Sequence, residues 1–289
     1  TAALALAEKV GGSEKSFVEK MKQKLAEWGI QSPHLINATG LNTQTISGDP
    51  DGKGDENQLS AYDIAVIAKH LLQDFPEVTK YTSKPTALFS NTQIENPNLM
   101  LEGMPNYRSG VDGLRVSNST KGGITFAAST TQNGIHMITV VLGVEAVDGD
   151  PYARFVATSS LMNYVVRTFV SSIVVKEGDP YGKSKATIMD GKSETVLAVA
   201  KKDFYIVEKQ GSQAEPKIQF KSDQESFRAP VKSGTNLGKL HYTDPDKIGR
   251  GYLEDQEPTV DMVAGRTIEK SFFLKVWWNE FVRYVNEKL

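Results

Sequence analysis

The stretch Gly110 to Ser119 contains the side chains whose types and spacing best fit a binding site. Gly113 precedes a cation, Arg115, and several hydroxyl side chains follow that cation. This composition is typical of a strand edge that meets a ligand. We therefore interpret this stretch as the first candidate for a binding site.

Few other residues are suited to metal binding or nucleophilic catalysis. The sequence has no Cys, which excludes disulfides, thiolate metal sites and Cys nucleophiles. Its four His, at positions 34, 70, 136 and 241, lack ligand spacing and are interpreted as ordinary surface or core residues. The acidic loop Asp49 to Asp55 suggests calcium, but it misses the Gly and Glu positions of a calcium-binding loop. We therefore expect a solvated turn there, and neither a metal nor a cofactor.

The overall composition sets the expected size and class. The chain has 289 residues, with 33 Lys and Arg against 35 Asp and Glu. This length predicts two domains and a sizeable core, and the balanced charge gives no indication of a nucleic-acid partner. No signal peptide or membrane-spanning apolar run is recognised. Thr1 to Lys9 has the composition of a helix interior without an N-cap, so we expect the natural start to lie further upstream.

Strands and helices that would position the candidate stretch lie on both sides of it in the sequence. Phe126–Thr130 and His136–Leu142 are β-rich, and Asn133-Gly134 between them predicts a tight hairpin turn. Apolar residues at helical spacing and capping residues predict helices. The expected helices run over Thr1–Val10, from Ser13 to Trp28, from Ser60 to Phe75 and from Pro151 to Phe169.

The composition changes after Ser172 to short β-rich runs with turns at close intervals. These runs predict a small β-sandwich without helices. They are Ile173–Val175, Thr195–Ala200, Phe204–Glu208, Lys217–Phe220, Leu237–Tyr242 and Thr259–Val263.

The end of the chain, Ile268 to Leu289, has the pattern of an amphipathic helix rich in aromatic residues. Such a helix can lie in a membrane interface, or it can dock on the protein's own surface, and we favour the interface because of the number of bulky side chains. The expected apolar face comprises Phe273, Leu274, Trp277, Trp278, Phe281, Val282, Tyr284 and Val285. Of these, Phe273, Trp277, Trp278 and Phe281 are the residues expected to face the membrane.

Several separate segments together resemble one known family. In chain order they are Asn37-Ala-Thr-Gly-Leu41, Leu59-Ser-Ala-Tyr-Asp-Ile-Ala, Val111-Asp-Gly-Leu114, the hairpin, the long helix, the β-rich region and the terminal helix. This order is similar to that of the low-molecular-weight penicillin-binding proteins, which are serine D-alanyl-D-alanine carboxypeptidases. The resemblance covers nearly the whole chain.

The resemblance implies an α+β fold in three parts. Residues 1–171 would form a partial, β-lactamase-like transpeptidase domain with an antiparallel sheet and helices, 172–264 a β-sandwich, and 265–289 a membrane-anchor helix. The family works in peptidoglycan biosynthesis and cell shape, and its members bind stem peptides and β-lactams. The implied location is the outer face of the bacterial cytoplasmic membrane, for an exported and peripheral protein.

The family's chemistry depends on three motifs. A Ser-x-x-Lys motif places a nucleophile one helical turn from a lysine that takes its proton, and a Ser-x-Asn motif supplies a proton relay and substrate contacts. In a Lys-Thr-Gly motif, the cation and hydroxyl meet the terminal carboxylate of the substrate. No Ser in this sequence has a Lys three positions on or an Asn two positions on. The resemblance therefore implies that the first two motifs belong to an upstream segment. That segment would then be a possible binding partner of this chain.

The third motif is present in altered form. Where the family has Lys-Thr-Gly, this sequence has Arg115-Val116-Ser117. Arg115 keeps the charge in a longer, planar side chain, Val116 lacks the hydroxyl, and Ser117 adds a Cβ where glycine admits the ligand. Asn118 follows at the position whose backbone N–H completes the oxyanion hole. We expect these four residues to bind the substrate. A literal Lys232-Ser-Gly234 is interpreted as a chance match in a turn.

Two hypotheses follow from the resemblance. The first is a serine hydrolase that removes the terminal D-alanine of peptidoglycan pentapeptides through an acyl-enzyme, with Ser and Lys supplied by the upstream segment. The second is a non-catalytic, membrane-associated relative that binds cell-wall peptide weakly. For the sequence by itself we favour the second, because it lacks the nucleophile and its third motif is altered.

Overall fold

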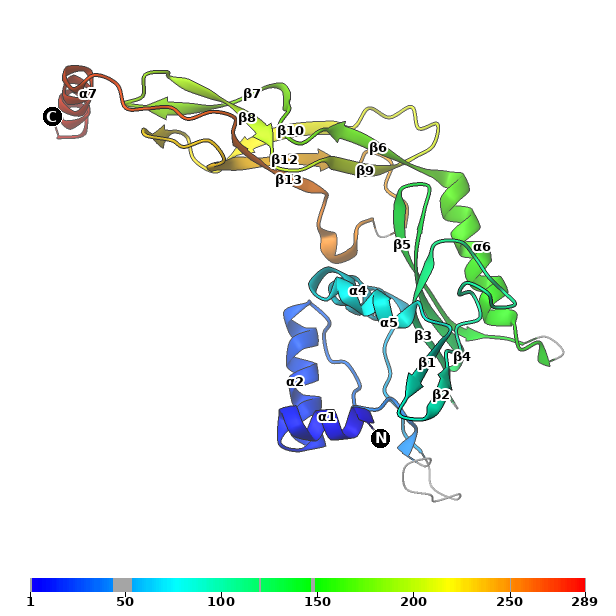
Figure 1. Cartoon of the computed structure of the whole chain (residues 1–289). Coiled ribbons are helices and arrows are strands. Elements are labelled where there is room, and N and C mark those ends of the chain that lie inside the picture. Colours follow the sequence, from blue (N-terminus) through cyan, green and yellow to red (C-terminus); the bar gives the residue numbers. More distant parts are fainter. Residues whose placement is uncertain (1, 44–53, 120, 147–148, 250, 289) are drawn as a thin grey trace. The chain divides into compact units, whose positions relative to one another are not determined.

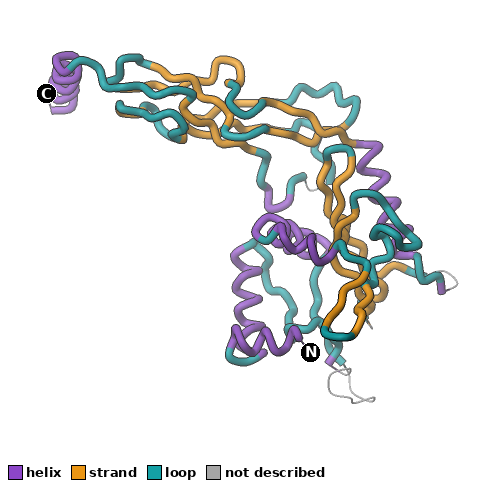
Figure 2. The backbone as a smooth tube through the Cα atoms, viewed as in Figure 1, coloured by secondary structure: helices purple, strands orange, loops and turns teal. Residues whose placement is uncertain are grey.

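The computed structural model describes residues 2–43, 54–119, 121–146, 149–249 and 251–288. The chain divides into two compact units, Thr1–Thr168 and Phe169–Leu289. Figures 1 and 2 show that helices and a central sheet make up the first unit, and that the second consists mainly of strands and ends in a helix. The α+β class predicted from the sequence is confirmed. The boundary after residue 171 stays an expectation; the two units meet where α6 passes directly into β6.

Two helices of the first unit, α2 and α4, begin at the capping residues that the sequence indicates. The Ser13 hydroxyl accepts from the Ser16 N–H, and Ser60 forms a reciprocal capping box with Asp63. The helices are α1 (Ala2–Gly11), α2 (Glu14–Glu27), α4 (Ala61–Asp74), the 3₁₀ turn η1 (Pro76–Val78), α5 (Thr79–Thr82) and α6 (Ala153–Thr168). The helix expected from Pro151 to Phe169 is α6, which begins and ends slightly inside those bounds.

The sheet of the first unit has three antiparallel strands in the order β3-β4-β5. They are β3 (Val111–Ser119), β4 (Gly123–Gln132) and β5 (Ile135–Val144), and a separate ribbon pairs β1 (Thr86–Phe89) with β2 (Thr92–Glu95). The predicted hairpin is confirmed: Asn133 and Gly134 have positive φ, and Gln132 pairs with Ile135. Positive φ at both turn residues is the geometry that matches the twist of the flanking strands.

Two helices cover the sheet. Figure 1 shows the sheet lying between α4 and α6, and both helices contact β4 and β5. On the α6 side, the rings of Phe126 and Phe155 meet edge to face with centroids 5.5 Å apart. Because β4 is the central strand of this layer, its buried side chains anchor β3, the candidate binding strand, to the core.

Gly113 allows α5 to approach β3 closely. A Cβ at this position would lie 2.7 Å from the Thr82 hydroxyl oxygen, and that hydroxyl donates to the Asp112 carbonyl over 2.6 Å. The register of β3 against β4 is irregular between Val111 and Gly113. This glycine, which marked the candidate stretch in the sequence, is therefore needed for α5 to pack directly against β3.

The second unit is built on two sheets that share one core. A six-stranded sheet has the order β10-β12-β13-β8-β7-β11, and β6 pairs with β9 in a second sheet. The strands are β6 (Phe169–Val175), β7 (Pro180–Met189), β8 (Thr195–Ala200), β9 (Phe204–Lys209), β10 (Lys217–Ser222), β11 (Phe227–Arg228), β12 (Asn236–Thr243) and β13 (Thr259–Ala264). Side chains from both sheets, among them Phe204, Ile206, Leu240 and Met262, form one buried cluster. The predicted sandwich is confirmed.

The unit also contains elements that the sequence analysis did not predict. Strands β7 and β11 were missed, and a short 3₁₀ turn, η3 (Leu253–Asp255), precedes β13. The terminal helix is α7 (Phe273–Lys288). Among the described residues, no helix has the length and apolar character needed to cross a membrane.

Candidate functional site

The four residues expected to bind the substrate lie in the second half of β3 and border two cavities. Arg115, Ser117 and Asn118 line a groove of about 710 Å³, together with the loop that contains Thr39 and Glu56. Val116, Ser117 and Asn118 also line a smaller cavity of about 250 Å³, beside α6. The structure therefore brings all four to one stretch of strand but separates Arg115 from Val116.

Behind β3, Arg154 of α6 holds the strand in place. Its guanidinium donates to the carbonyls of Ser117 (2.9 Å) and Thr125 (3.0 Å), and to the side-chain oxygen of Asn118. Arg154 is buried, and this burial lowers the pKa of its guanidinium. Two carbonyls and an amide oxygen thus compensate the charge and fix the backbone at Ser117 and Asn118.

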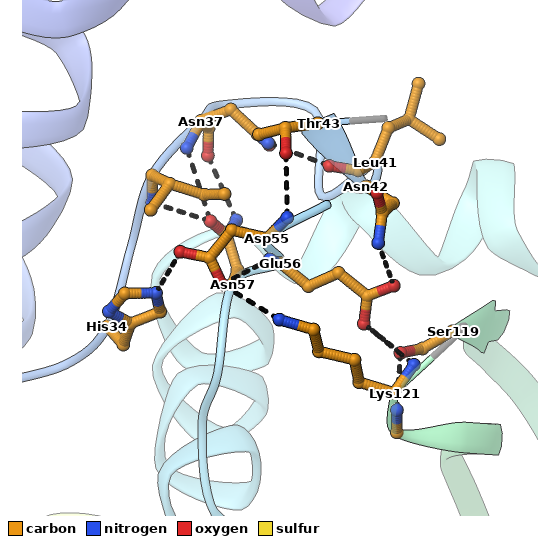
Figure 3. A network of polar contacts seen from close by, with 12 residues as sticks. His34, Asn37, Leu41, Asn42, Thr43, Asp55, Glu56, Asn57, Ser119 and Lys121 are labelled. Carbon is orange, nitrogen blue, oxygen red and sulfur yellow. Dashed lines mark hydrogen bonds and ion pairs between the residues drawn. The ribbon is translucent and has the colours of Figure 1, made fainter. Parts of the chain in front are cut away.

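On the other side, an acidic network connects the end of β3 to the loop before α4 (Figure 3). Glu56 is buried, and its carboxylate accepts from the Asn42 amide (2.9 Å), the Ser119 hydroxyl and the Lys121 backbone N–H (3.3 Å). These donors come from the loop before α4 and from the turn after β3. Glu56 therefore fastens the turn between β3 and β4 to the loop.

Asp55, next to Glu56, extends the network at the surface. Its carboxylate contacts the His34 ring (2.9 Å) and the Lys121 ammonium (3.4 Å). The hydrogen bond with His34, followed by that from the Glu56 N–H, lowers the pKa of the Asp55 carboxyl below its ordinary value. The Thr43 N–H donates to the Asp55 carbonyl (2.9 Å), and the Asp55 N–H donates to the Thr43 hydroxyl (2.7 Å). We call residues 41–43 and 55–57 the neck, since hydrogen bonds join Asn42 to Glu56 and Thr43 to Asp55.

Within the described residues, no three His, Cys, Asp or Glu side chains gather as metal ligands. Most of the acidic loop Asp49 to Asp55, where calcium was considered, lies outside the described residues. Chemically, the groove offers a cation, hydroxyls and backbone groups, which suit the binding of a peptide carboxylate.

Two other sequence expectations concern the second unit. The Lys232-Ser-Gly234 match lies in a turn before β12, as interpreted. The aromatic residues Phe273, Trp277, Trp278 and Phe281 are all exposed on α7, with fractions of 67%, 59%, 58% and 47%. Large apolar side chains exposed together on one helix indicate an interaction surface.

Sequence reasoning missed three residues that shape the site. Glu56 and Lys121 meet across 65 positions of sequence. Arg154 of α6 meets Ser117 of β3 across 37 positions. The only sequence signal for Arg154 was a cation on the otherwise apolar face of a predicted helix. Such a residue requires a buried partner.

Comparisons with known proteins agree with the fold. Residues 1–146 match the D-alanyl-D-alanine carboxypeptidase family, and residues 169–270 match the C-terminal domain of penicillin-binding protein 5. Among curated proteins, the chain is 28% identical to DacA of Haemophilus influenzae over 83% of this chain and 56% of that protein. It is 25% identical to DacF of Bacillus subtilis over 83% of this chain and 57% of that protein. The chain thus spans little more than half the length of these relatives.

A solved structure is more similar. A peptidoglycan synthesis regulatory factor (PBP3) from Streptococcus pneumoniae shares 46% identity and a TM-score of 0.87, over 93% of this chain and 73% of that one. The structure of penicillin binding protein 5 from Haemophilus influenzae, 24% identical with a TM-score of 0.61, has the same fold. With half of its length matched by the family and its second unit matched by the associated domain, the chain belongs to the low-molecular-weight D-alanyl-D-alanine carboxypeptidase family of penicillin-binding proteins.

Proposed function

We propose that β3 binds the D-alanyl-D-alanine end of a peptidoglycan stem peptide in extended form, and that a β-lactam occupies the same position. The observation that carries this proposal is the placement of Arg115, Ser117 and Asn118 along one groove, in a member of this family. Arg115 supplies the cation for the terminal carboxylate of the peptide. Arg154 and Glu56 hold the strand from its two sides and so pre-organise it.

The altered motif weakens this binding. Val116 offers no hydroxyl to the ligand, and the Cβ of Ser117 keeps the peptide backbone at a greater distance than glycine would. We therefore propose weak binding without turnover for this sequence, which also has no Ser-x-x-Lys or Ser-x-Asn motif. The alternative is an acyl-enzyme carboxypeptidase whose Ser and Lys come from an additional segment, an alternative favoured by the greater length of the relatives.

Intact mass after incubation with a penicillin separates the two functions. A chain that binds without reacting keeps its mass, whereas a stoichiometric adduct would refute the non-catalytic proposal. Peptide binding is measured by NMR titration with an acetylated tripeptide ending in D-Ala-D-Ala, against its L-Ala-L-Ala counterpart. Ser117→Gly should strengthen the D-isomer shifts along β3 and Arg115→Ala should weaken them; equal shifts with both isomers would argue against the proposed substrate.

We further propose that α7 docks on the lipid surface at the outer face of the cytoplasmic membrane. The exposed Phe273, Trp277, Trp278 and Phe281 support this, because aromatic side chains favour the headgroup region. The helix would then hold the protein at the membrane as a peripheral protein. Co-sedimentation with phosphatidylglycerol-containing vesicles, with and without residues 273–289, tests it; equal sedimentation of both forms would refute docking through α7.

A further inference from the structure

Backbone hydrogen bonds connect the segment before α7, Ile268 to Ser271, to Val231 and to the turn between β7 and β8. Ile268 is buried and its backbone exchanges hydrogen bonds with Val231 in both directions. The Lys192 N–H donates to the Glu269 carbonyl (2.9 Å), and the Ser271 N–H donates to the Asp190 carbonyl (2.8 Å). The chain therefore reaches the first residue of the helix with its backbone already fixed on the sheet.

The second turn of α7 is held by side chains around Asp190. Arg228 of β11 contacts Asp190 through Nε (3.2 Å) and Glu280 of the helix through a terminal nitrogen (2.7 Å). The Asn279 amide donates to the other oxygen of Asp190 (3.3 Å). The Asp190 side chain is only 1% exposed, so its charge depends on these partners.

Apolar packing contributes little to this attachment. A cavity of about 410 Å³ lies between the β7–β8 end and the helix, bordered by Ile188, Trp278, Asn279 and Val282. Trp277, Trp278 and Phe281 remain largely exposed. Since a well-packed interface would fill this space and bury those rings, the polar contacts decide the orientation of the helix.

We propose that Asp190, Arg228, Asn279 and Glu280 form a clamp that holds α7 in one orientation, in which Phe273, Trp277 and Phe281 are exposed and Trp278 borders the cavity beside the sandwich. We call these four residues the α7 clamp. They act as positioning residues: the aromatic surface is presented before any lipid is met, and the helix needs no release from the sandwich. The lipid part of this inference rests on the proposed membrane docking, whereas the orientation of the helix does not.

Hydrogen–deuterium exchange of the full chain without lipid tests the clamp. We expect Asn279→Ala/Glu280→Ala to raise exchange in α7 roughly tenfold, because the helix then detaches locally while Asp190 keeps Arg228. Arg228→Gln attacks the clamp from the sandwich side and should give the same increase. The control Glu257→Gln removes an ion pair with Lys247, which is 2.7 Å long and lies outside the clamp; it should leave α7 unchanged. Unchanged exchange in both clamp variants would overturn the proposal.

A second measurement links the clamp to the lipid surface. In a Trp28→Phe background, only Trp277 and Trp278 report fluorescence. Bound to vesicles with brominated acyl chains, the unaltered clamp should give a single quenching depth, and the helix-side variant should give a broader one at a similar bound fraction. A chain that does not bind vesicles refutes membrane docking, while the exchange experiment still decides the clamp. If the unaltered chain and the helix-side variant show identical quenching and identical amide exchange, the clamp residues do not position α7.

Discussion

At the scale of single residues, the site depends on charges that are compensated in unusual ways. Arg154 brings a guanidinium to the back of β3, where it donates hydrogen bonds to two backbone carbonyls and one amide oxygen. A buried guanidinium that donates to carbonyl groups also fixes the positions of those groups. Its main effect is therefore on the backbone of Ser117 and Asn118, the residues expected to meet the ligand.

Arg154→Met should destabilise the first unit. Removing the guanidinium leaves the carbonyls of Ser117 and Thr125 without this donor, at a cost of about 2–3 kcal/mol in the free energy of unfolding. Urea unfolding followed by Trp28 fluorescence, with Trp277 and Trp278 replaced by Phe, measures it. Arg167→Met, at an exposed position of the same helix, should change stability by less than about 0.5 kcal/mol. Equal effects of the two substitutions would contradict this role.

Asp55 should make the neck sensitive to acid. Its folded-state pKa is lowered, chiefly by the hydrogen bond with His34. A depressed carboxyl pKa contributes stability that is present above the ordinary value of 3.8 and is lost as pH falls through the lower folded value. The melting temperature of the first unit should therefore fall less steeply below pH 3.8 in Asp55→Asn than in the unaltered chain. Parallel curves for the two proteins would rule out this contribution.

At the scale of elements, the neck and the turn between β3 and β4 should open and close together in amide exchange. Glu56 connects them through Ser119 and Lys121. Glu56→Gln keeps the size of the side chain but replaces an acceptor with a donor, so one contact becomes repulsive. We expect faster amide exchange at residues 117–123 and a loss of about 1.5–3 kcal/mol. Ser119→Ala removes one donor to Glu56 and the acceptor of the Gly122 N–H, and it leaves the other donors to Glu56 in place, so it should give a smaller change. An exchange pattern unaffected by Glu56→Gln would contradict the coupling.

Local patterns predicted the elements that local chemistry determines. Asn133-Gly134 indicated a hairpin because Asn and Gly readily adopt the positive φ that a two-residue hairpin turn requires. Ser60 indicated a helix start because the capping box is contained in four consecutive residues. Strand β7 was missed because only Ser184, Ala186 and Ile188 are buried among charged and polar neighbours. Two of these three residues are small, and the register of β7 against β8 is irregular between Pro180 and Lys185.

The candidate site was predictable only in part, because some of its residues are consecutive in the sequence and others come from distant positions. Arg115, Val116, Ser117 and Asn118 are consecutive, so a resemblance in sequence located them together. Glu56 and Arg154 reach the same strand from distant parts of the chain. Neither has a local signature, since a carboxylate in a polar loop and a cation on a helix are usually solvated. Their roles depend on the tertiary fold, which places α6 and the neck on opposite sides of β3.

At the scale of the whole molecule, the two units have separate interiors. The core of the second unit consists of side chains from Val175 to Ile268, and the sheet of the first unit is complete within Val111 to Val144. A unit with its own hydrophobic core is expected to fold by itself. The aromatic helix α7 and its clamp belong to the second unit, so membrane docking and peptide binding are proposed for different units of the chain.

Residues 169–289 should therefore fold when produced alone, and Tyr242 provides the test. Burial, followed by the nearby Asp244 carboxylate, raises the pKa of Tyr242 from 10.0 to about 12. A raised tyrosine pKa gives stability that is fully present below pH 10 and is lost as pH rises from 10 to 12. The isolated unit should retain this delayed ionisation, measured by ultraviolet absorbance, and Tyr242→Phe should reduce both the delayed signal and the alkaline loss of melting temperature. If every tyrosine of the isolated unit ionised near pH 10, the core around Tyr242 would require the first unit, and the two interiors would not be independent.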